Sequence, residues 1–330
     1  MAQQNQAADQ TVAGGEDVQS VQRLRDAHQQ IIGELEKVIV GQQSVIDELM
    51  IAIFARGHCL LVGVPGLAKT LLVSTLSRCL SLSFKRVQFT PDLMPSDITG
   101  TEILADDPET GQRQFKFLPG PVFANIVLAD EINRSSPRTQ SALLEAMGEG
   151  RVTFDGISHE LPRPFFVIAT RNLAESHGTF PLPQSQLDRF LLSFGIGYPG
   201  INEEVEILER HEHGEVSVQP VLTADEIADM QAQVYRVEVA RPVKEYIAGI
   251  VAATRESGEI AIGVSPRGAV FLQRAAQAWA AMAGRDFVAP DDVKAVAQPV
   301  LHHRIVPRSA TTGSPDGCID AILNTVPVPL

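Results

Sequence analysis

The stretch His58–Thr70, with the sequence HCLLVGVPGLAKT, holds the residues whose types and spacing best suit phosphate chemistry. An apolar segment, residues 58–62, precedes a turn that starts at Gly63, and Lys69 and Thr70 then open an apolar, helix-compatible run. Strand, glycine loop and helix N-terminus together form the context of a phosphate-binding P-loop. Backbone N–H groups and the positive helix end surround the anion in such a loop. We therefore expect Lys69 to reach the β- and γ-phosphates and Thr70 to offer its hydroxyl to Mg²⁺.

The loop departs from the general G-x-x-x-x-G-K-[ST] pattern because Ala68 stands where the last glycine is expected. Glycine is obligatory only where φ is positive or where a ligand touches Cα. The methyl group of an alanine is therefore tolerated at this position if the backbone there has a helical φ. For this stretch taken alone, the alternative is an ordinary strand-to-helix turn with a chance Lys-Thr.

A second apolar segment, residues 125–129, ends in two acidic residues, Asp130 and Glu131. Buried strands of a parallel sheet bring their carboxyl ends to one crevice, beside the glycine loop. Phosphoryl transfer to water requires an acidic residue for Mg²⁺ and a base for the attacking water. We expect Asp130 to hold Mg²⁺ through its water shell and Glu131 to polarise the water. Alternatively, the two acids cap a strand at the surface.

Three further polar residues give weaker signals on their own. Asn172 follows an apolar segment and either orients the water or closes a turn. Arg189 stands immediately before another apolar segment and either stabilises phosphoryl-transfer charge or pairs with Asp188 at the surface. Arg267 opens a helix in the second half of the chain, where simple solvation is the alternative.

The composition of the 330 residues is that of a globular protein, with 44% hydrophobic and 20% charged residues. A net charge of −13 weighs against proteins that coat nucleic acids or anionic membranes. The three cysteines lack metal-ligand spacing, and we expect Cys59 and Cys79 in the core. The N-terminus lacks the pattern of a signal peptide, and no apolar run reaches the ~18 residues of a membrane span, which favours a cytoplasmic location.

Hydrophobic periodicity predicts an α/β domain followed by helices alone. The segments expected as strands are 58–62, 84–89, 125–129, 165–170 and 190–194. A hairpin is expected over 150–161, whereas the Pro- and Gly-rich stretch 90–121 is either functional or carries small elements of its own. The later helices are expected at about 202–213, 223–237, 242–257, 267–283 and 290–302.

These patterns predict four regions along the chain. They are a disordered tail over 1–16, an α/β nucleotide-binding core over 17–199, a helical lid over 200–306 and a loop-like C-terminal tail over 307–330. Histidines such as His211 and His303 are expected at solvated helix ends, because no second cluster completes a metal site.

The order of five segments resembles the MoxR family of AAA+ ATPases over roughly residues 20–305. The segments LVGVPGLAKT, IVLADEINR, ATRN, LPQSQLDRF and VSPRG are similar to its Walker A, Walker B, sensor 1, arginine-finger and sensor 2 motifs. Ala68 fits this family, in which GxPGxAKT is common. The resemblance implies a five-stranded parallel sheet with a helix-2 insert, a hairpin before sensor 1 and a small all-helical lid.

The resemblance also assigns roles to residues. ATP would be held by the loop residues Gly63, Val64, Pro65, Gly66, Leu67, Ala68, Lys69 and Thr70, with Val40 and Gly41 lining the adenine pocket. Asp130 would support Mg²⁺ beside Thr70, and Glu131 would be the general base. Asn172 would be sensor 1, Arg189 would reach the ATP of the neighbouring subunit, and Arg267 would couple the nucleotide to the lid.

Members of this family are typically hexameric, work with von Willebrand factor A-domain partners and resemble chaperones that activate metalloenzymes or remodel complexes. The resemblance therefore implies an ATP-hydrolysing ring that remodels protein clients. The alternative is a nucleic-acid motor, since related helicases carry the same insert and hairpin. The insert is acidic, with Asp92, Asp97, Glu102, Asp106, Asp107 and Glu109. A motor that tracks phosphates needs Lys and Arg at the pore, so the protein remodeller is favoured.

Overall fold

In the computed structural model of the chain, the described residues are 2–64, 66–106, 112–172, 178–212, 214, 216–309 and 314–329, with side chains from residue 19 onward. Pro65 of the glycine loop, Asp107 and Glu109 of the insert, and His213 lie outside the described residues. Among the described residues, no helix combines the length and the apolar character needed to cross a membrane.

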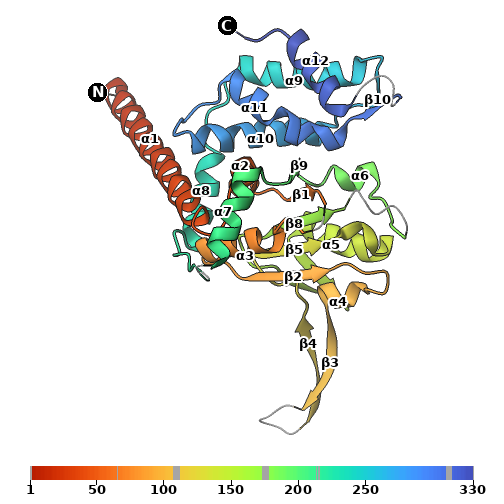
Figure 1. The fold of residues 1–330 in the computed structure, drawn as a ribbon. Coiled ribbons are helices and arrows are strands. Elements are labelled where there is room, and N and C mark those ends of the chain that lie inside the picture. The colour runs from red at the N-terminus through yellow and green to blue at the C-terminus, as the bar shows by residue number, and fades with distance from the viewer. Residues whose placement is uncertain are drawn as a thin grey trace.

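A five-stranded sheet forms the centre of the first domain (Figure 1). Its strands are β1 (Cys59–Val62), β2 (Phe84–Gln88), β5 (Ile126–Asp130), β8 (Phe166–Arg171) and β9 (Leu192–Gly195). They lie in the order β2-β5-β8-β1-β9, and every neighbouring pair is parallel. The inner strands are buried because helices cover both faces, whereas the edge strand β2 keeps polar residues exposed. The predicted parallel sheet is confirmed.

Six helical segments connect or flank these strands. They are α2 (Gln43–Phe54), α3 (Lys69–Cys79), the 3₁₀ turn η1 (Ile132–Arg134), α5 (Pro137–Glu149), α6 (Gln184–Leu187) and α7 (Ile201–Glu212). Alternate strand residues face opposite sides of the sheet. Thus Leu128 packs into the cluster that contains α2 and α3, and Val127 packs into the cluster that contains α5.

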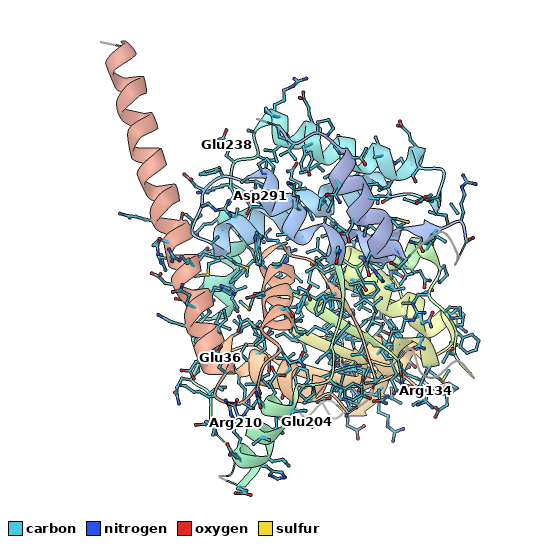
Figure 2. All side chains as sticks on the ribbon, turned by 45° about the horizontal axis from the view of Figure 1, so that its top comes forward. Glu36, Arg134, Glu204, Arg210, Glu238 and Asp291 are labelled. Atoms are coloured by element: carbon cyan, nitrogen blue, oxygen red, sulfur yellow. The ribbon has the colours of Figure 1, made fainter. Side chains whose placement is uncertain are left out.

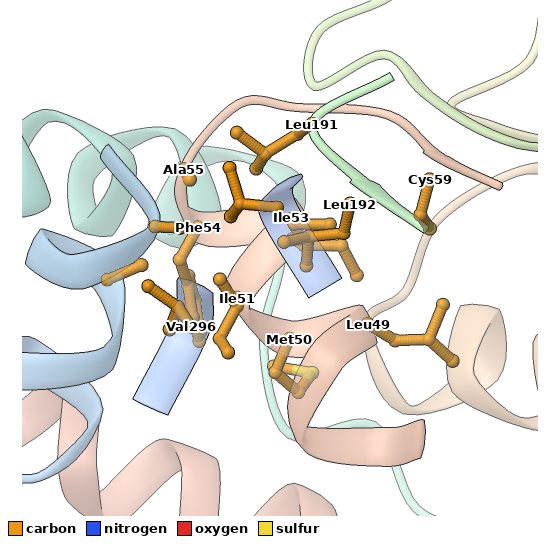
Figure 3. Close-up of a cluster of buried hydrophobic side chains, with 14 of the residues drawn as sticks. Leu49, Met50, Ile51, Ile53, Phe54, Ala55, Cys59, Leu191, Leu192 and Val296 are labelled. Atoms are coloured by element: carbon orange, nitrogen blue, oxygen red, sulfur yellow. The ribbon is translucent and has the colours of Figure 1, made fainter. Parts of the chain in front are cut away.

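Helix α2 lies between the sheet and the second domain, and for this reason it is apolar on nearly all sides. Figure 3 shows its Ile51 and Phe54 near Val296 of the second domain, while Leu192 of β9 and the preceding Leu191 lie beside Ile53. All these side chains belong to one continuous buried cluster. The two domains therefore share a core.

The second domain is mainly helical, as predicted, and Figure 1 shows its helices layered above the sheet. Its helical segments are α8 (Ala224–Val234), α9 (Arg241–Glu256), α10 (Pro266–Met282), α11 (Pro290–Leu301) and the 3₁₀ turn η2 (His302–Arg304). A short antiparallel pair, β10 (Ile260–Ile262) with β11 (Val306–Pro307), adds strands to a lid that was expected to be all-helical.

The prediction of a loop-like tail over 307–330 was wrong, because α12 (Pro315–Thr325) forms there. Ser314 caps this helix by accepting a hydrogen bond from the Gly317 N–H at 3.1 Å, and Pro315 occupies the first helical position. Cys318, Ile319 and Ile322 are buried against the lid. The segment is therefore part of the lid's packing.

The structure also differs from the disordered tail predicted for residues 1–16, because α1 (Ala2–Leu35) begins at Ala2. Alanine and glutamine, which are frequent in this stretch, favour helix. Farther along α1, Val21, Leu24 and Ile31 are buried and attach the helix to the rest of the molecule. Figure 1 shows the N-terminal end of α1 projecting beyond the body.

The insert 90–121 carries its own elements, α4 (Pro95–Thr99), β3 (Gly100–Asp106) and β4 (Arg113–Pro119). β3 and β4 pair as an antiparallel ribbon that projects away from the lid (Figure 1). The predicted hairpin is confirmed as β6 (Arg151–Phe154) and β7 (Ile157–Glu160), with positive φ at Asp155 and Gly156 in the turn.

Candidate active site

A cavity of about 390 Å³ lies where the glycine loop meets the carboxyl ends of β5 and β8. The residues that line it come from four segments of the chain and are Gly66, Leu67, Ala68, Lys69, Thr70, Arg86, Gln88, Asp130, Glu131, Thr170 and Asn172. The structure thus brings together the predicted phosphate-binding, acidic and amide residues.

The glycine loop is shaped by close packing at one end and by left-handed backbone at the other. Gly63 leaves no room for a side chain, since a Cβ there would lie 2.7 Å from the Ile196 side chain. The condition of a helical φ at Ala68 is not met, because its φ is +52° and its ψ is 24°. The chain must reverse sharply before α3 begins at Lys69, and a left-handed residue makes that turn.

Lys69 extends along the loop, and its Nζ donates a hydrogen bond to the Gly63 carbonyl at 3.0 Å. Burial lowers the pKa of Lys69, and the nearby carboxylates of Asp130 and Glu131 act in the opposite direction. The ammonium therefore lies within the field of both acids.

Asp130 is held on both of its oxygens. The buried hydroxyl of Thr170 donates to Oδ1 at 2.6 Å, and Arg86 donates to Oδ2 from Nε at 3.2 Å and from Nη2 at 2.6 Å. Thr170 also accepts a hydrogen bond from the Glu131 N–H at 2.8 Å. One hydroxyl thus orients both acidic residues.

Glu131 begins the turn after β5 in left-handed backbone, with φ +55°. Its Oε2 accepts from Gln88 Nε2 at 2.9 Å and from Arg134 Nη1 at 3.0 Å. A non-glycine residue in this conformation is strained. The change of backbone direction means that the Glu131 side chain no longer follows the alternating pattern of β5.

A larger cavity of about 690 Å³ adjoins the first and shares Gly66, Leu67 and Ala68 with it. Its walls are largely apolar and include Val38, Ile39, Val40, Leu71, Leu72, Ile196, Pro199 and Ile207. Arg210 of α7, labelled in Figure 2, lines it as well and pairs with Glu206. Val40 lines this cavity, whereas Gly41 does not, and the Glu203 carboxylate lies over Gly41.

The two predicted arginines lie outside both cavities of their own chain. Arg189 is exposed and donates from Nη1 to the Leu144 carbonyl at 2.9 Å. Arg267 is half exposed, with its Nη1 3.7 Å from Asp188 Oδ2. Asp188 does not pair with Arg189 as the alternative interpretation supposed; it accepts hydrogen bonds from Arg304 Nε and Ser265 Oγ, both at 2.9 Å.

Sequence reasoning missed three residues that line the smaller cavity, Arg86, Gln88 and Thr170. It also missed Arg304 of the lid, which donates a hydrogen bond to Asp188. The alternation in the stretch KRVQF indicated a strand and placed Arg86 and Gln88 on one face of it, which was the available signal. His303 was expected at a solvated helix end, but it is buried against the residues that precede β9, as is the neighbouring Arg304. His211, in contrast, is exposed in the last turn of α7, as expected, and it borders the larger cavity.

Comparisons with known proteins agree with this geometry. The family described as "ATPase family associated with various cellular activities (AAA)" matches residues 58–192, and the AAA lid domain matches residues 252–322. The protein YeaC of Bacillus subtilis is 43% identical over 91% of this chain and 94% of its own length. The chaperone MoxR1 of Mycobacterium tuberculosis is 39% identical over 90% of this chain and 81% of its own.

A crystal structure of a protein proposed to be an ATPase, from Cytophaga hutchinsonii, has the same fold. It superposes with a TM-score of 0.89 at 38% identity and covers 97% of this chain and 99% of that one. The similarity therefore extends through both domains.

Proposed function

Because this chain belongs to the MoxR family of AAA+ ATPases, we propose that it binds ATP with Mg²⁺ and hydrolyses ATP to ADP and phosphate. The single observation that carries the proposal is the cavity in which Lys69, Thr70, Asp130 and Glu131 meet at the glycine loop. Phosphoryl transfer to water requires a cation, a hydroxyl and two carboxylates close together. Here the cation and the hydroxyl open a helix, whose N-terminus also favours phosphate.

The two joined cavities divide the nucleotide between them. The larger, mostly apolar cavity takes the base and ribose against Val40 and Ile207, and the smaller one takes the phosphates. The loop residues from Gly63 to Thr70 hold the phosphates, and Lys69 leaves the Gly63 carbonyl to neutralise them.

The donor set of the smaller cavity fits Mg²⁺. The Thr70 hydroxyl and the Asp130 carboxylate are hard oxygen donors, and among the described residues no group of three His, Cys, Asp or Glu side chains forms a complete metal cage. Mg²⁺ is usually bound by one or two such protein ligands together with substrate phosphates and water. Thr70 and Asp130 would hold the ion, and its charge would stabilise that of the phosphates.

Glu131 acts as the general base toward the attacking water. Its carboxylate is occupied by Gln88 and Arg134, and it must turn away from both to accept a proton. The backbone of Glu131 stays fixed on Thr170 during this rotation, and Asn172, which lines the same cavity, positions the water or the terminal phosphate.

The assembly is a ring that the reaction requires, in which each chain supplies Arg189 to the next. Arg189 is exposed and lies outside its own chain's cavities, which supports action on a neighbouring subunit. Arg267, at the start of α10, couples the nucleotide to the lid. A hexamer is the proposed form.

The work of the ring is the remodelling or activation of protein clients in the cytoplasm, with a von Willebrand factor A-domain protein as partner. The relative MoxR1 is described as a chaperone, which supports this role. The acidic insert and hairpin disfavour the second candidate, a nucleic-acid motor, because phosphates would be repelled there.

Two variants test the ATPase assignment. Lys69→Ala should lose ATP binding, measured with a fluorescent ATP analogue, whereas Glu131→Gln should bind Mg–ATP and release phosphate at least ~100-fold more slowly than the unaltered chain, as expected for loss of a general base. Unchanged nucleotide affinity in Lys69→Ala would overturn the site.

Mixing experiments test the proposed ring. Lys69→Ala and Arg189→Ala chains should each be inactive alone, and a mixture should regain part of the turnover through interfaces at which an intact site meets an intact arginine. Co-assembly without any regained turnover counts against action of Arg189 in trans.

A further inference from the structure

Arg86 is a cation inside the phosphate cavity to which the family motifs assign no role. It lies on the edge strand β2, and its half-exposed side chain reaches across to β5. Nε and Nη2 both donate to Asp130 Oδ2, and Nη2 also donates to Gln88 Oε1 at 2.8 Å. The guanidinium therefore faces the same space as Lys69.

The two oxygens of Asp130 are held in different ways. Thr170, 1% exposed, fixes Oδ1 from within the sheet, whereas Arg86, with a side chain 46% exposed, holds Oδ2 from the solvent side of the cavity. A carboxylate oxygen that supports a hydrated cation must offer its electron pairs on this open side. Arg86 and a bound cation would therefore compete for the same oxygen, Oδ2 of Asp130.

The contact between Arg86 and Asp130 is open to solvent on its arginine side, where the side chain is 46% exposed and water competes for the guanidinium, whereas Asp130 is 16% exposed. Phosphate oxygens, in contrast, offer a guanidinium several acceptors in the planar, two-pronged arrangement that it binds best. A terminal phosphate entering beside Lys69 would therefore compete for Arg86.

We propose that Arg86 is an additional ATP-binding residue, which neutralises Asp130 in the nucleotide-free protein and transfers to the terminal phosphate when Mg–ATP is bound. This inference rests on the proposed function, because it takes the cavity to be the phosphate site.

A consequence follows for Glu131. Gln88 joins Arg86 to Glu131, since its Oε1 accepts from Arg86 while its Nε2 donates to Glu131 Oε2. When Arg86 leaves, the Gln88 amide loses the contact that fixes its orientation and can release the Glu131 carboxylate. Arrival of the terminal phosphate would thereby remove one of the two side chains that hold the base and leave its contact with Arg134.

The test compares the affinities of ATP and ADP in the presence of Mg²⁺, measured by displacement of a fluorescent nucleotide. Arg86→Gln should weaken ATP binding about tenfold, the loss expected for one charge-assisted hydrogen-bonded contact, and change ADP binding less than about twofold. Arg86→Lys should recover part of the ATP affinity. Lys85→Gln is the matched control, because Lys85 is an exposed cation on the same strand that lies outside the cavity.

The outcomes separate the inference from the proposed function. Equal losses for ATP and ADP, or no loss for either, would overturn the role of Arg86 while Lys69→Ala still abolished binding. If Lys69→Ala left nucleotide binding intact, the proposed function would fall, and this inference with it.

Discussion

At the scale of single residues, the backbone at Ala68 shows a conflict between position and residue type. A left-handed conformation disfavours any residue with a Cβ, by roughly 1–2 kcal/mol, and the structure places an alanine there. The Cβ adds nothing that phosphate binding requires, because anion binding in the loop depends on N–H groups.

Ala68→Gly should therefore raise the free energy of unfolding by about 0.5–1 kcal/mol, the strain relieved minus the entropy that glycine adds to the unfolded chain. Chemical denaturation measures the change, and ATP affinity should be preserved. The control is Ala232→Gly, at an exposed position inside α8, which should lower the free energy of unfolding by about 1 kcal/mol. Equal destabilisation by both variants would contradict the strain assigned to Ala68.

A second residue-scale prediction concerns Glu48 of α2. Burial, with a smaller contribution from Asp47, raises the pKa of Glu48 to about 8. The folded state then binds more protons than the unfolded state between pH 4.5 and 8, so this group lowers stability as the pH rises through that window.

Glu48→Gln removes the charge and should stabilise the protein by on the order of 2–3 kcal/mol at pH 8, with much less effect near pH 5. Denaturation curves of both proteins at the two pH values provide the measurement. A gain that does not depend on pH would point to packing and would rule out the titration of Glu48 as its cause.

At the scale of elements, the sequence predicts strands and helices well where hydrophobic periodicity is strong. β5 and β8 are apolar up to their polar carboxyl ends, and α9 and α11 end within a residue or two of their predicted limits. The strands β3 and β4 were not located within the stretch 90–121. Apolar residues of this ribbon, such as Ile103, Leu104 and Phe115, are exposed, so its sequence does not alternate between a buried apolar face and a polar one.

The residues of the candidate site also differ in how well the sequence predicts them. Short motifs along the chain contain Lys69, Thr70, Asp130 and Glu131, and the spacing within these motifs indicates what the residues do. Arg86 stands in no such motif, and Thr170 lies within the segment ATRN without a role assigned to it, since each acts through a neighbour on another strand. Long-range pairing of side chains on adjacent strands is what a single sequence leaves undetermined.

The two hairpins of the α/β domain are joined by aromatic contacts, which allow a prediction at this scale. The Phe117 ring of β4 stacks on His159 of β7, with centroids 4.0 Å apart and planes at 14°, and also lies 5.9 Å from the Phe154 ring. Phe117→Ala should loosen the β3–β4 ribbon, so that its amides exchange hydrogen about 2–10-fold faster, as expected for loss of an aromatic pair.

Hydrogen exchange resolved along the chain measures this effect. Phe115→Ala on the same strand is the matched control, because Phe115 is 74% exposed, and it should leave the exchange rates nearly unchanged. ATP affinity should stay constant in both variants, since neither ring lines a cavity. Similar acceleration by both substitutions would mean that the stack does not hold the ribbon.

At the scale of the whole molecule, a buried cation joins the lid to the sheet. Arg304, 2% exposed, donates to the carboxylate of Asp188 and to the carbonyls of Phe190 and Leu191, just before β9. Asp188 also accepts from Ser265, the residue that caps α10. The residue after Asp188 is Arg189, so the loop that presents this arginine is fixed to the lid on both sides.

Asp188→Asn leaves Arg304 buried without its countercharge, and it should lower the free energy of unfolding by about 3–5 kcal/mol. Burial lowers the pKa of Arg304 to about 10, and Asp188 opposes that shift, so Arg304 stays charged at neutral pH and the loss persists there. Adding Arg304→Met should restore much of the stability, because an apolar side chain of similar length removes the unpaired charge. The free energies of unfolding of the two single variants and the double variant, measured with denaturant, complete a double-mutant cycle. Additive losses would show that the two residues stabilise the joint independently, whereas recovery in the double variant would establish that charge pairing, and not packing alone, fastens the lid to the segment that carries Arg189.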